Sequence, residues 1–229
     1  MLNQFFRDLL DLIFPRCCAG CDKPLIGSEQ TLCTICRISL PRIGAQGLQK
    51  EILQNKFVNE PAVVFTHSFL LFTKKGKVQK LLHALKYRGN QEVGLVLGEM
   101  FGQEMKDSEQ LSGVDLIISV PLHARKRKSR GYNQSDLLAE GFSRATGIPW
   151  SASALKRLKF TETQTGKNKI ERRDNVKGVF EADKNLQVSK VIIIDDVLTT
   201  GATLEECVQT LTNAGCREFV ILTIALAQH

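Results

Sequence analysis

Residues 191–203 read Val-Ile-Ile-Ile-Asp-Asp-Val-Leu-Thr-Thr-Gly-Ala-Thr and carry the strongest structural signal in a chain of 229 residues. The apolar run that ends at Ile194 predicts a buried strand over residues 188–194. The glycine and threonines that follow predict a turn leading into a helix. Asp195 and Asp196 then lie at the carboxyl end of the strand, where open α/β sheets bind their ligands.

The chemistry of this turn points to a phosphate. Its backbone amides and the hydroxyls of Thr199, Thr200 and Thr203 can surround a phosphate at the positive end of the helix, and Gly201 lets the backbone come close. Two carboxylates beside one phosphate suit a ribose 5-phosphate, whose hydroxyls need acceptors. A strand-end carboxylate pair that binds magnesium in a phosphotransfer protein is the alternative. The chain has no GxxxxGK[ST] sequence, which excludes a Walker A loop.

Strands and helices alternate around this segment. Residues 62–72 are predicted to form a strand or a hairpin, and further strands are predicted over 114–120 and 218–227. Helices are predicted over 78–87, 93–105, 135–146 and 204–214. The alternation predicts an α/β domain over residues 62–229, with a mostly parallel sheet of about five strands covered by helices on both faces. Residues 46–62 show no strong pattern and are interpreted as a linker.

Five of the seven cysteines lie within residues 17–36. Cys18 and Cys21 form one CxxC pair and Cys33 and Cys36 another, and four thiolates complete a tetrahedral zinc shell. A redox CxxC and an iron–sulfur site are the alternatives, but two matched pairs in about 20 residues favour structural zinc. Cys17 is left outside the shell, since Cys18 gives the symmetric spacing. With an amphipathic helix at its start, this module is predicted to cover residues 1–45.

No secretory signal and no apolar stretch of membrane-spanning length are found. We therefore expect a cytoplasmic protein, a compartment in which clustered cysteines bind metals. The apolar stripe of residues 1–14 is expected to dock on the core, and a position at the inner face of the membrane is the alternative.

The net charge of +7 comes from two segments. Residues 125–130 hold five basic residues and no acid, and residues 156–173 hold seven against Glu162 and Glu171. A polyanion is expected at both, either the phosphates of a small substrate or a nucleic-acid backbone.

The run from Asp195 to Thr203 resembles the 5-phosphoribosyl-1-pyrophosphate (PRPP) signature of type I phosphoribosyltransferases. Other short motifs occur in order along the chain: Leu85-Lys86-Tyr87-Arg88-Gly89, Val120-Pro121-Leu122-His123, Arg130-Gly131-Tyr132-Asn133-Gln134 and Arg172-Arg173-x-Asn175-Val176. Together with the CxxC pairs, they make the whole chain similar to the ComF family, in which a cysteine module precedes a domain of this type.

The resemblance implies a PRPP site with Mg²⁺, and it names the residues. Asp195, Asp196 and Arg172 are the candidate catalytic residues. PRPP is expected to contact Lys86, the loop Pro121, Leu122 and His123, and the run Asp195, Asp196, Val197, Leu198, Thr199, Thr200, Gly201, Ala202 and Thr203. Arg125, Lys126, Arg127, Lys128 and Arg130 either neutralise the pyrophosphate or bind nucleic acid, and the residues do not decide between these.

The resemblance also implies a hood over the substrate. Residues 62–87 and a loop at 159–173 are expected to form it, and a disordered insertion is the alternative for the loop. Purine phosphoribosyltransferases carry an acidic residue where this chain has Thr199, so a purine acceptor is not expected.

Two functions are consistent with these features. The first is a PRPP-binding phosphoribosyltransferase-type protein with an unknown acceptor, acting in DNA uptake and natural transformation as the resemblance implies. The second is a non-enzymatic single-stranded DNA-binding accessory protein of the DNA-uptake machinery, in which the pocket is regulatory. Whether the chain forms a homo-oligomer stays open.

Overall fold

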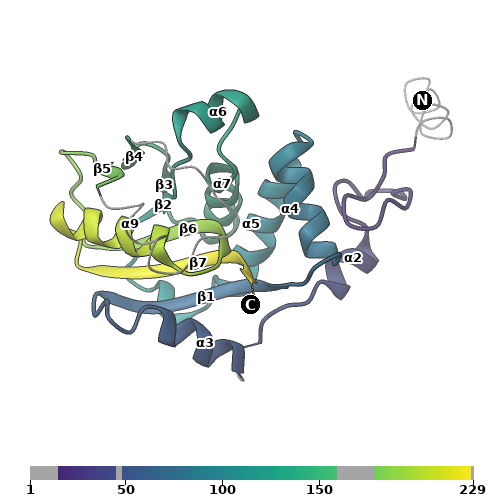
Figure 1. Cartoon of the computed structure of the whole chain (residues 1–229). Coiled ribbons are helices and arrows are strands. Elements are labelled where there is room, and N and C mark those ends of the chain that lie inside the picture. The colour runs from purple at the N-terminus through teal and green to yellow at the C-terminus, as the bar shows by residue number, and fades with distance from the viewer. Residues whose placement is uncertain (1–14, 45–47, 159–177, 228–229) are drawn as a thin grey trace.

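A computed structural model describes residues 15–44, 48–158 and 178–227 and places a five-stranded parallel sheet at the centre of the molecule (Figure 1). The strand order is β1 (Val63–Phe72), β7 (Glu218–Ala227), β6 (Lys190–Leu198), β2 (Leu116–Ser119) and β3 (Trp150–Ser151). All four pairings are parallel. This confirms the predicted α/β fold class.

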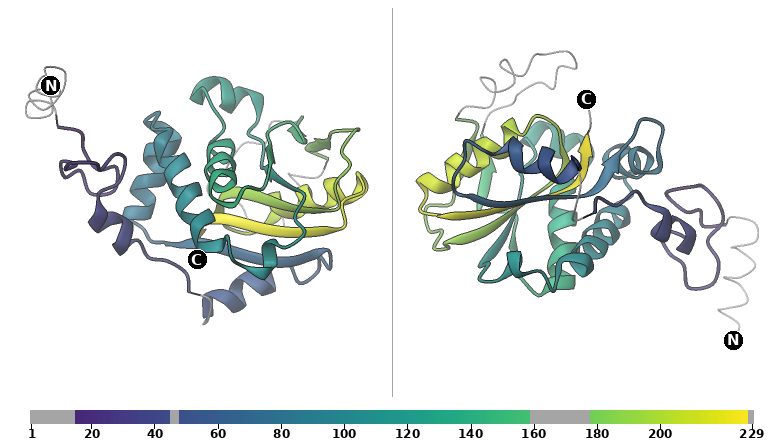
Figure 2. Two further views of the ribbon diagram at one scale, coloured as in Figure 1. Left: turned by 180° about the vertical axis from the view of Figure 1, so that it is seen from behind. Right: turned by 90° about the horizontal axis from the view of Figure 1, so that it is seen from below.

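Helices cover both faces of the sheet (Figures 1 and 2). One face carries α4 (Lys77–Tyr87), α5 (Glu92–Met105) and α7 (Gln134–Thr146), which share a core with Ile192 and Ile194 of β6. The other carries α3 (Leu48–Lys56) and α9 (Ala202–Asn213), which share a core with Val191 and Ile193. Successive side chains of β6 therefore enter opposite cores, which explains its continuous apolar sequence.

Helices α5 and α7 touch through their backbones. A Cβ added at Gly98 would lie 2.3 Å from the carbonyl oxygen of Leu138, and one at Gly141 would lie 2.2 Å from that of Leu95. Only glycine permits this approach. The crossing fixes the position of α7, whose first turn contributes to the site described below.

The structure corrects the predicted hood. Residues 63–72 form a strand as predicted, but β1 pairs with β7 as the edge strand of the main sheet, so this segment is no hood. An apolar run predicts a strand without identifying its partner, because strand pairing is a contact between distant segments. The predicted loop at 159–173 lies outside the described residues.

The predicted linker at 46–62 contains helix α3, in which Leu53 is buried, and Phe57, directly after the helix, is buried as well. Three further elements had no clear pattern in the sequence: the two-residue strand β3, and the antiparallel pair β4 (Leu155–Arg157) and β5 (Phe180–Ala182). They are too short for periodicity to predict them. The basic run at 125–130 forms helix α6 (Ala124–Arg130).

The cysteine module and the sheet domain share one core. Cys18, Cys36 and Leu40 pack in the same buried cluster as Phe69 and Leu81. The segment after α2 (Thr34–Ser39) also adds an antiparallel bridge to β1, Arg42 opposite Leu70. Within the described ranges, no helix is long and apolar enough to cross a membrane.

Candidate functional site

The sheet topology has a switch point between β2 and β6, and the region at the carboxyl ends of these two strands is called the β2/β6 crevice below. The chain leaves β2 through α7 toward β3, and it leaves β6 through α9 toward β7, so the two neighbouring strands lead in opposite directions. Open α/β sheets bind ligands where the strand order reverses in this way. Ser119, the last residue of β2, pairs with Ile194, and β6 continues to Leu198 beyond the end of its neighbour.

Asp196 is buried and is paired with a cation. Its Oδ2 lies 2.7 Å from Nζ of Lys86, which α4 brings over the strand end. Burial alone would lower the pKa of the Lys86 ammonium, but the Asp196 carboxylate outweighs burial and raises it. Lys86 is therefore charged at neutral pH, as the predicted contact with an anionic ligand requires.

Asp195 accepts two hydrogen bonds at Oδ1, from Oγ of Ser135 at 2.9 Å and from the backbone amide of Asp196 at 2.8 Å. Burial and then the neighbouring Asp196 charge raise the pKa of Asp195 to about 7. Ser135 lies in the first turn of α7, next to the Asn133 cap that accepts its amide. Ser135 lies next to the Arg130–Gln134 motif, but no local sequence pattern indicates that its hydroxyl bonds Asp195, 60 residues away.

Asn133 also ties the start of α7 to β2. Its Nδ2 donates to the carbonyl oxygen of Val120 at 3.1 Å and to Oδ1 of Asp136 at 2.6 Å. The Asp136 carboxylate accepts a further bond from Oγ of Ser119, also at 2.6 Å. This network holds the end of β2, and the Pro121–His123 loop that follows it, against α7.

The end of α3 contacts and supports the Thr199–Thr203 loop, and the sequence pattern did not predict this helix. Gly201 caps α9 with φ of +91°, a conformation that favours glycine. A Cβ at Gly201 would lie 3.4 Å from Cζ of Phe57, and Nζ of Lys56 donates to the carbonyl oxygen of Thr199. The end of α3 therefore supports this loop from below.

Cations converge on the crevice from three elements. Burial lowers the pKa of Lys126 in α6, and Arg157, Arg130 and Lys86 lower it further, so these charges lie within electrostatic range of one another. Arg157 extends from β4 across the ring of Phe180, at 5.4 Å from its centroid. Burial lowers the pKa of its guanidinium, and the negative charge of Asp195 acts in the opposite direction, so the two groups lie within electrostatic range. In the sequence Arg157 is one residue of a basic run. Its position near Asp195 follows only from the folded structure.

His123 lies at the mouth of the crevice and caps α6. Its Nδ1 accepts from the backbone amide of Arg125 at 3.1 Å. Partial burial and then Arg157, Arg125 and Lys126 lower the pKa of its imidazole, which is neutral at pH 7 as a result. Pro121 and Leu122 precede it in the same half-exposed loop.

Helix α6 divides the basic run into two sets. Lys126 and Arg130, four residues apart and thus on one helix face, are partly buried toward the crevice. Arg125, Arg127 and Lys128 are exposed. Arg130 also lies over the ring of Tyr87 at 5.7 Å. Arg172, a predicted catalytic residue, lies outside the described residues.

The four predicted metal-ligating thiols come together in the N-terminal module. One Sγ atom from each of Cys18, Cys21, Cys33 and Cys36 lies within 4.8 Å of the others. The Sγ atoms of Cys21 and Cys33 are 3.8 Å apart, and two ligands of a tetrahedral ion with Zn–S of about 2.3 Å would be separated by about that distance. Cys17 is exposed and lies outside this cluster.

The backbone around the thiols is also typical of a metal-thiolate site. The amides of Gly20 and Cys33 donate to Sγ of Cys18 at 3.4 and 3.3 Å. Burial raises the pKa of Cys18, but these amide hydrogen bonds outweigh it and lower the pKa to about 7. The cluster is therefore compatible with a zinc site that has no open position for catalysis.

Comparison with known proteins agrees with the geometry. The phosphoribosyl transferase domain family matches residues 144–229. The DNA utilization protein YhgH of Salmonella typhimurium is 29% identical, with 89% of this chain and 94% of that protein covered. Competence protein F of Haemophilus influenzae is 38% identical over 55% of this chain and 56% of that protein, and competence protein ComFC of Bacillus subtilis is 26% identical over 84% and 72%.

The match to YhgH covers most of the chain, whereas the match to competence protein F covers about half of it. The similarity to these competence and DNA utilization proteins confirms the predicted resemblance to the ComF family, with a phosphoribosyl transferase domain matched over residues 144–229.

Proposed function

We propose that this protein binds PRPP in the β2/β6 crevice and acts as a phosphoribosyltransferase-type protein. The observation that carries the proposal is the ion pair between Lys86 and Asp196, with the Arg157 guanidinium within electrostatic range of Asp195. Lys126 and Arg130 lie within electrostatic range of Lys86 and add positive charge beside this pair. Four cations exceed the charge of two carboxylates, one of which has a pKa near 7. The crevice therefore has a surplus of positive charge that suits a pyrophosphate.

Each part of PRPP has a matching group. The loop amides and the hydroxyls of Thr199, Thr200 and Thr203 would hold the 5-phosphate at the start of α9. Asp195 and Asp196 would accept hydrogen bonds from the ribose hydroxyls and stabilise positive charge that develops at C1′. The carboxylates and the phosphate oxygens are ligands that Mg²⁺ prefers, and the ion would further neutralise the pyrophosphate.

The test is calorimetry with PRPP and Mg²⁺ on the full chain. Asp195→Asn combined with Asp196→Asn should weaken binding by about a hundredfold, because charge-assisted hydrogen bonds contribute roughly 1.5–3 kcal/mol each. Asp115→Asn is the control, since this carboxylate bonds the amides of Ser189 and Lys190 at the other end of the strands. Equal affinity of wild type and the double variant would contradict the proposal.

A second candidate function is single-stranded DNA binding on the outer face of α6. Lys126 and Arg130 face the crevice, whereas the exposed side chains on the rest of α6 are those of Arg125, Arg127 and Lys128. Each of these charges replaced by Gln should lower the slope of log K against log salt by about 0.7. Lys128→Gln should weaken DNA binding and leave PRPP binding unchanged, and Lys126→Gln should do the reverse. Equal effects of both variants on both ligands would contradict this division.

The names of the relatives support a cellular role with DNA, and we extend the proposal to DNA uptake. A deletion strain should lose transformation efficiency, and the wild-type gene should restore it. Failure of the Asp195→Asn, Asp196→Asn double variant to restore it would tie this role to the crevice. An acceptor for the phosphoribosyl group should be sought outside the purines, because Thr199 offers no general base.

A further inference from the structure

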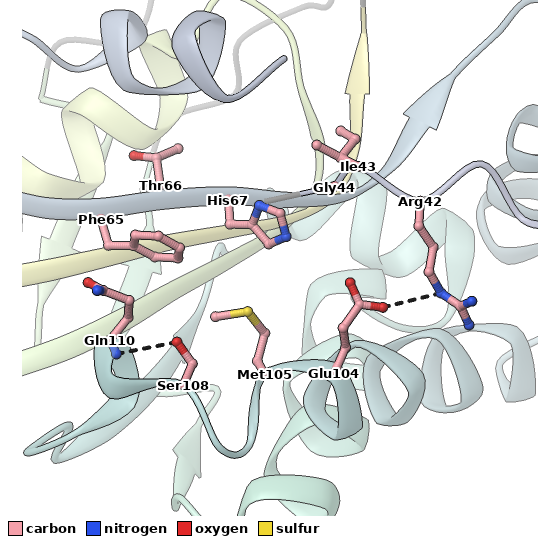
Figure 3. Close-up of a pocket in the computed structure, with 10 residues that line it drawn as sticks. All are labelled: Arg42, Ile43, Gly44, Phe65, Thr66, His67, Glu104, Met105, Ser108 and Gln110. Carbon is pink, nitrogen blue, oxygen red and sulfur yellow. Dashed lines mark hydrogen bonds and ion pairs between the residues drawn. The ribbon is translucent and has the colours of Figure 1, made fainter. Parts of the chain in front are cut away.

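A cavity lies at the edge strand β1, which β7 separates from β6 and from the groups at the β2/β6 strand ends. It has a volume of about 570 Å³ and opens between the edge strand β1 and the C-terminal end of α5 (Figure 3). Helix α5 leads toward the start of β2, so its C-terminus lies near the amino ends of the strands. The cavity is therefore separate from the groups proposed to bind PRPP, which gather at the carboxyl ends.

Aromatic and thioether groups supply its apolar surface. Phe65 and His67 extend from β1 across the cavity toward Met105 and Ser108, whereas Thr66 points away from it (Figure 3). The ring centroids of Phe65 and His67 are 6.1 Å apart, so the two rings present adjacent aromatic surface along one wall. Such a wall suits the face of a flat ring system.

Polar groups stand at the two ends of this wall. At one end are the Gln110 side-chain amide and the hydroxyl of Ser108, which accepts from the Gln110 backbone amide at 3.3 Å. At the other end, Nε of Arg42 lies 3.2 Å from Oε2 of Glu104. Both ends offer hydrogen-bond donors and acceptors to the edges of a ligand.

The lining residues of the cavity carry no net charge, which favours neutral over anionic flat ligands. Arg42 and Glu104 already neutralise each other, and burial lowers the pKa of His67 so that its imidazole is neutral. An anionic ligand would meet no unpaired cation among these residues. The volume falls in the range of about 300–1,000 Å³ that is typical of small-molecule sites.

We infer that this cavity binds a neutral, planar heteroaromatic molecule with hydrogen-bonding edges, the chemistry of a nucleobase or an unphosphorylated nucleoside. The ring system stacks on Phe65, and His67, whose ring is inclined by 39° to that of Phe65, contacts it at an angle. The edges of the ring system bond Gln110 at one end and the Arg42–Glu104 pair at the other. The inference does not depend on PRPP binding at the crevice.

The experiment is a titration of the full chain with adenosine and with uridine, in which binding is measured by saturation-transfer NMR. Both probes should bind saturably. Phe65→Leu keeps apolar bulk and removes the ring. It should weaken binding by roughly tenfold, since stacking of a base on an aromatic side chain typically contributes about 1–3 kcal/mol and about 1.4 kcal/mol is tenfold. Phe72→Leu, on the same strand but away from the cavity, should leave binding unchanged.

A second variant separates binding from folding. Gln110 is exposed, so Gln110→Leu removes the amide without disturbing the core and should also weaken binding. PRPP should not displace adenosine. Absence of saturable binding by either probe, equal affinity of wild type and both cavity variants, or displacement of adenosine by PRPP would each overturn the inference.

Discussion

Asp195 occupies a position that disfavours its own charge. It is half-buried beside Asp196, and the bonds from Ser135 and the Asp196 amide compensate only in part for desolvation and for the neighbouring charge. Its carboxyl is thus poised to change protonation near neutral pH. A ligand that brings hydroxyl donors and cations to the crevice would favour the ionised form.

This leads to a prediction about pH and stability. The pKa of Asp195 rises from 3.8 to about 7 on folding, so between these values the folded protein binds a proton that the unfolded chain does not. The contribution of Asp195 to the free energy of unfolding therefore falls as pH rises through this window. Asp195→Asn should be more stable than wild type at about pH 8. The difference should shrink as the pH falls through this window and should vanish only below the unfolded pKa of 3.8, as measured by urea unfolding.

A surface carboxylate gives the opposite sign and serves as the control. The amides of Lys190 and Ser189 lower the pKa of Asp115, so its stabilising effect is present at neutral pH and is lost as the pH falls. Asp115→Asn should be less stable than wild type at about pH 8 and should approach wild type in acid. A constant difference between wild type and Asp195→Asn across this range would contradict the raised pKa.

Among the secondary-structure elements, the α5–α7 pair does most to set the site, because Ser135 at the start of α7 bonds Asp195. The close backbone contact at Gly98 reverses the usual effect of alanine in a helix. Alanine normally stabilises a helix by about 1 kcal/mol relative to glycine. Here its Cβ would lie 2.3 Å from the Leu138 oxygen and force the helices apart.

We therefore expect Gly98→Ala to lower the free energy of unfolding by roughly 1–3 kcal/mol. It should also weaken PRPP binding, since α7 would move away from β6. Gln103→Ala, an exposed position on the same helix, should be close to neutral in both measurements. A Gly98→Ala protein as stable as wild type would show that the crossing tolerates displacement.

At the scale of the whole molecule, the cysteine module and the sheet domain share one buried core. The domain boundary that we predict at residue 45 rests on the sequence pattern alone. That the module is a separate unit stays a prediction. Because Cys18 and Cys36 pack with Phe69 and Leu81, loss of the metal should also lower the stability of the sheet domain.

Metal analysis and calorimetry test this coupling. Wild type and Cys17→Ser should each contain one zinc ion per chain, since Cys17 lies outside the cluster. Cys21→Ser should lose the ion and should unfold at a lower temperature in a single transition. Retained zinc in Cys21→Ser would contradict the site, and two separate transitions would contradict the shared core.

Local sequence determined the central strand, the two carboxylates, the threonine loop and the four-cysteine set. Each of these depends on neighbours within a few residues, where apolar periodicity and ligand spacing act directly. For the same reason the pattern around Val191–Thr203 predicted both the fold class and the place of the candidate site.

Only the tertiary structure decided which other residues join them. The sequence could not divide Lys126 and Arg130 from Arg125, Arg127 and Lys128, because that depends on which face of α6 meets the crevice. Ser135, Arg157 and the Lys56–Phe57 brace reach the site from segments far away in the chain. Long-range packing sets such contacts, and no local pattern records them.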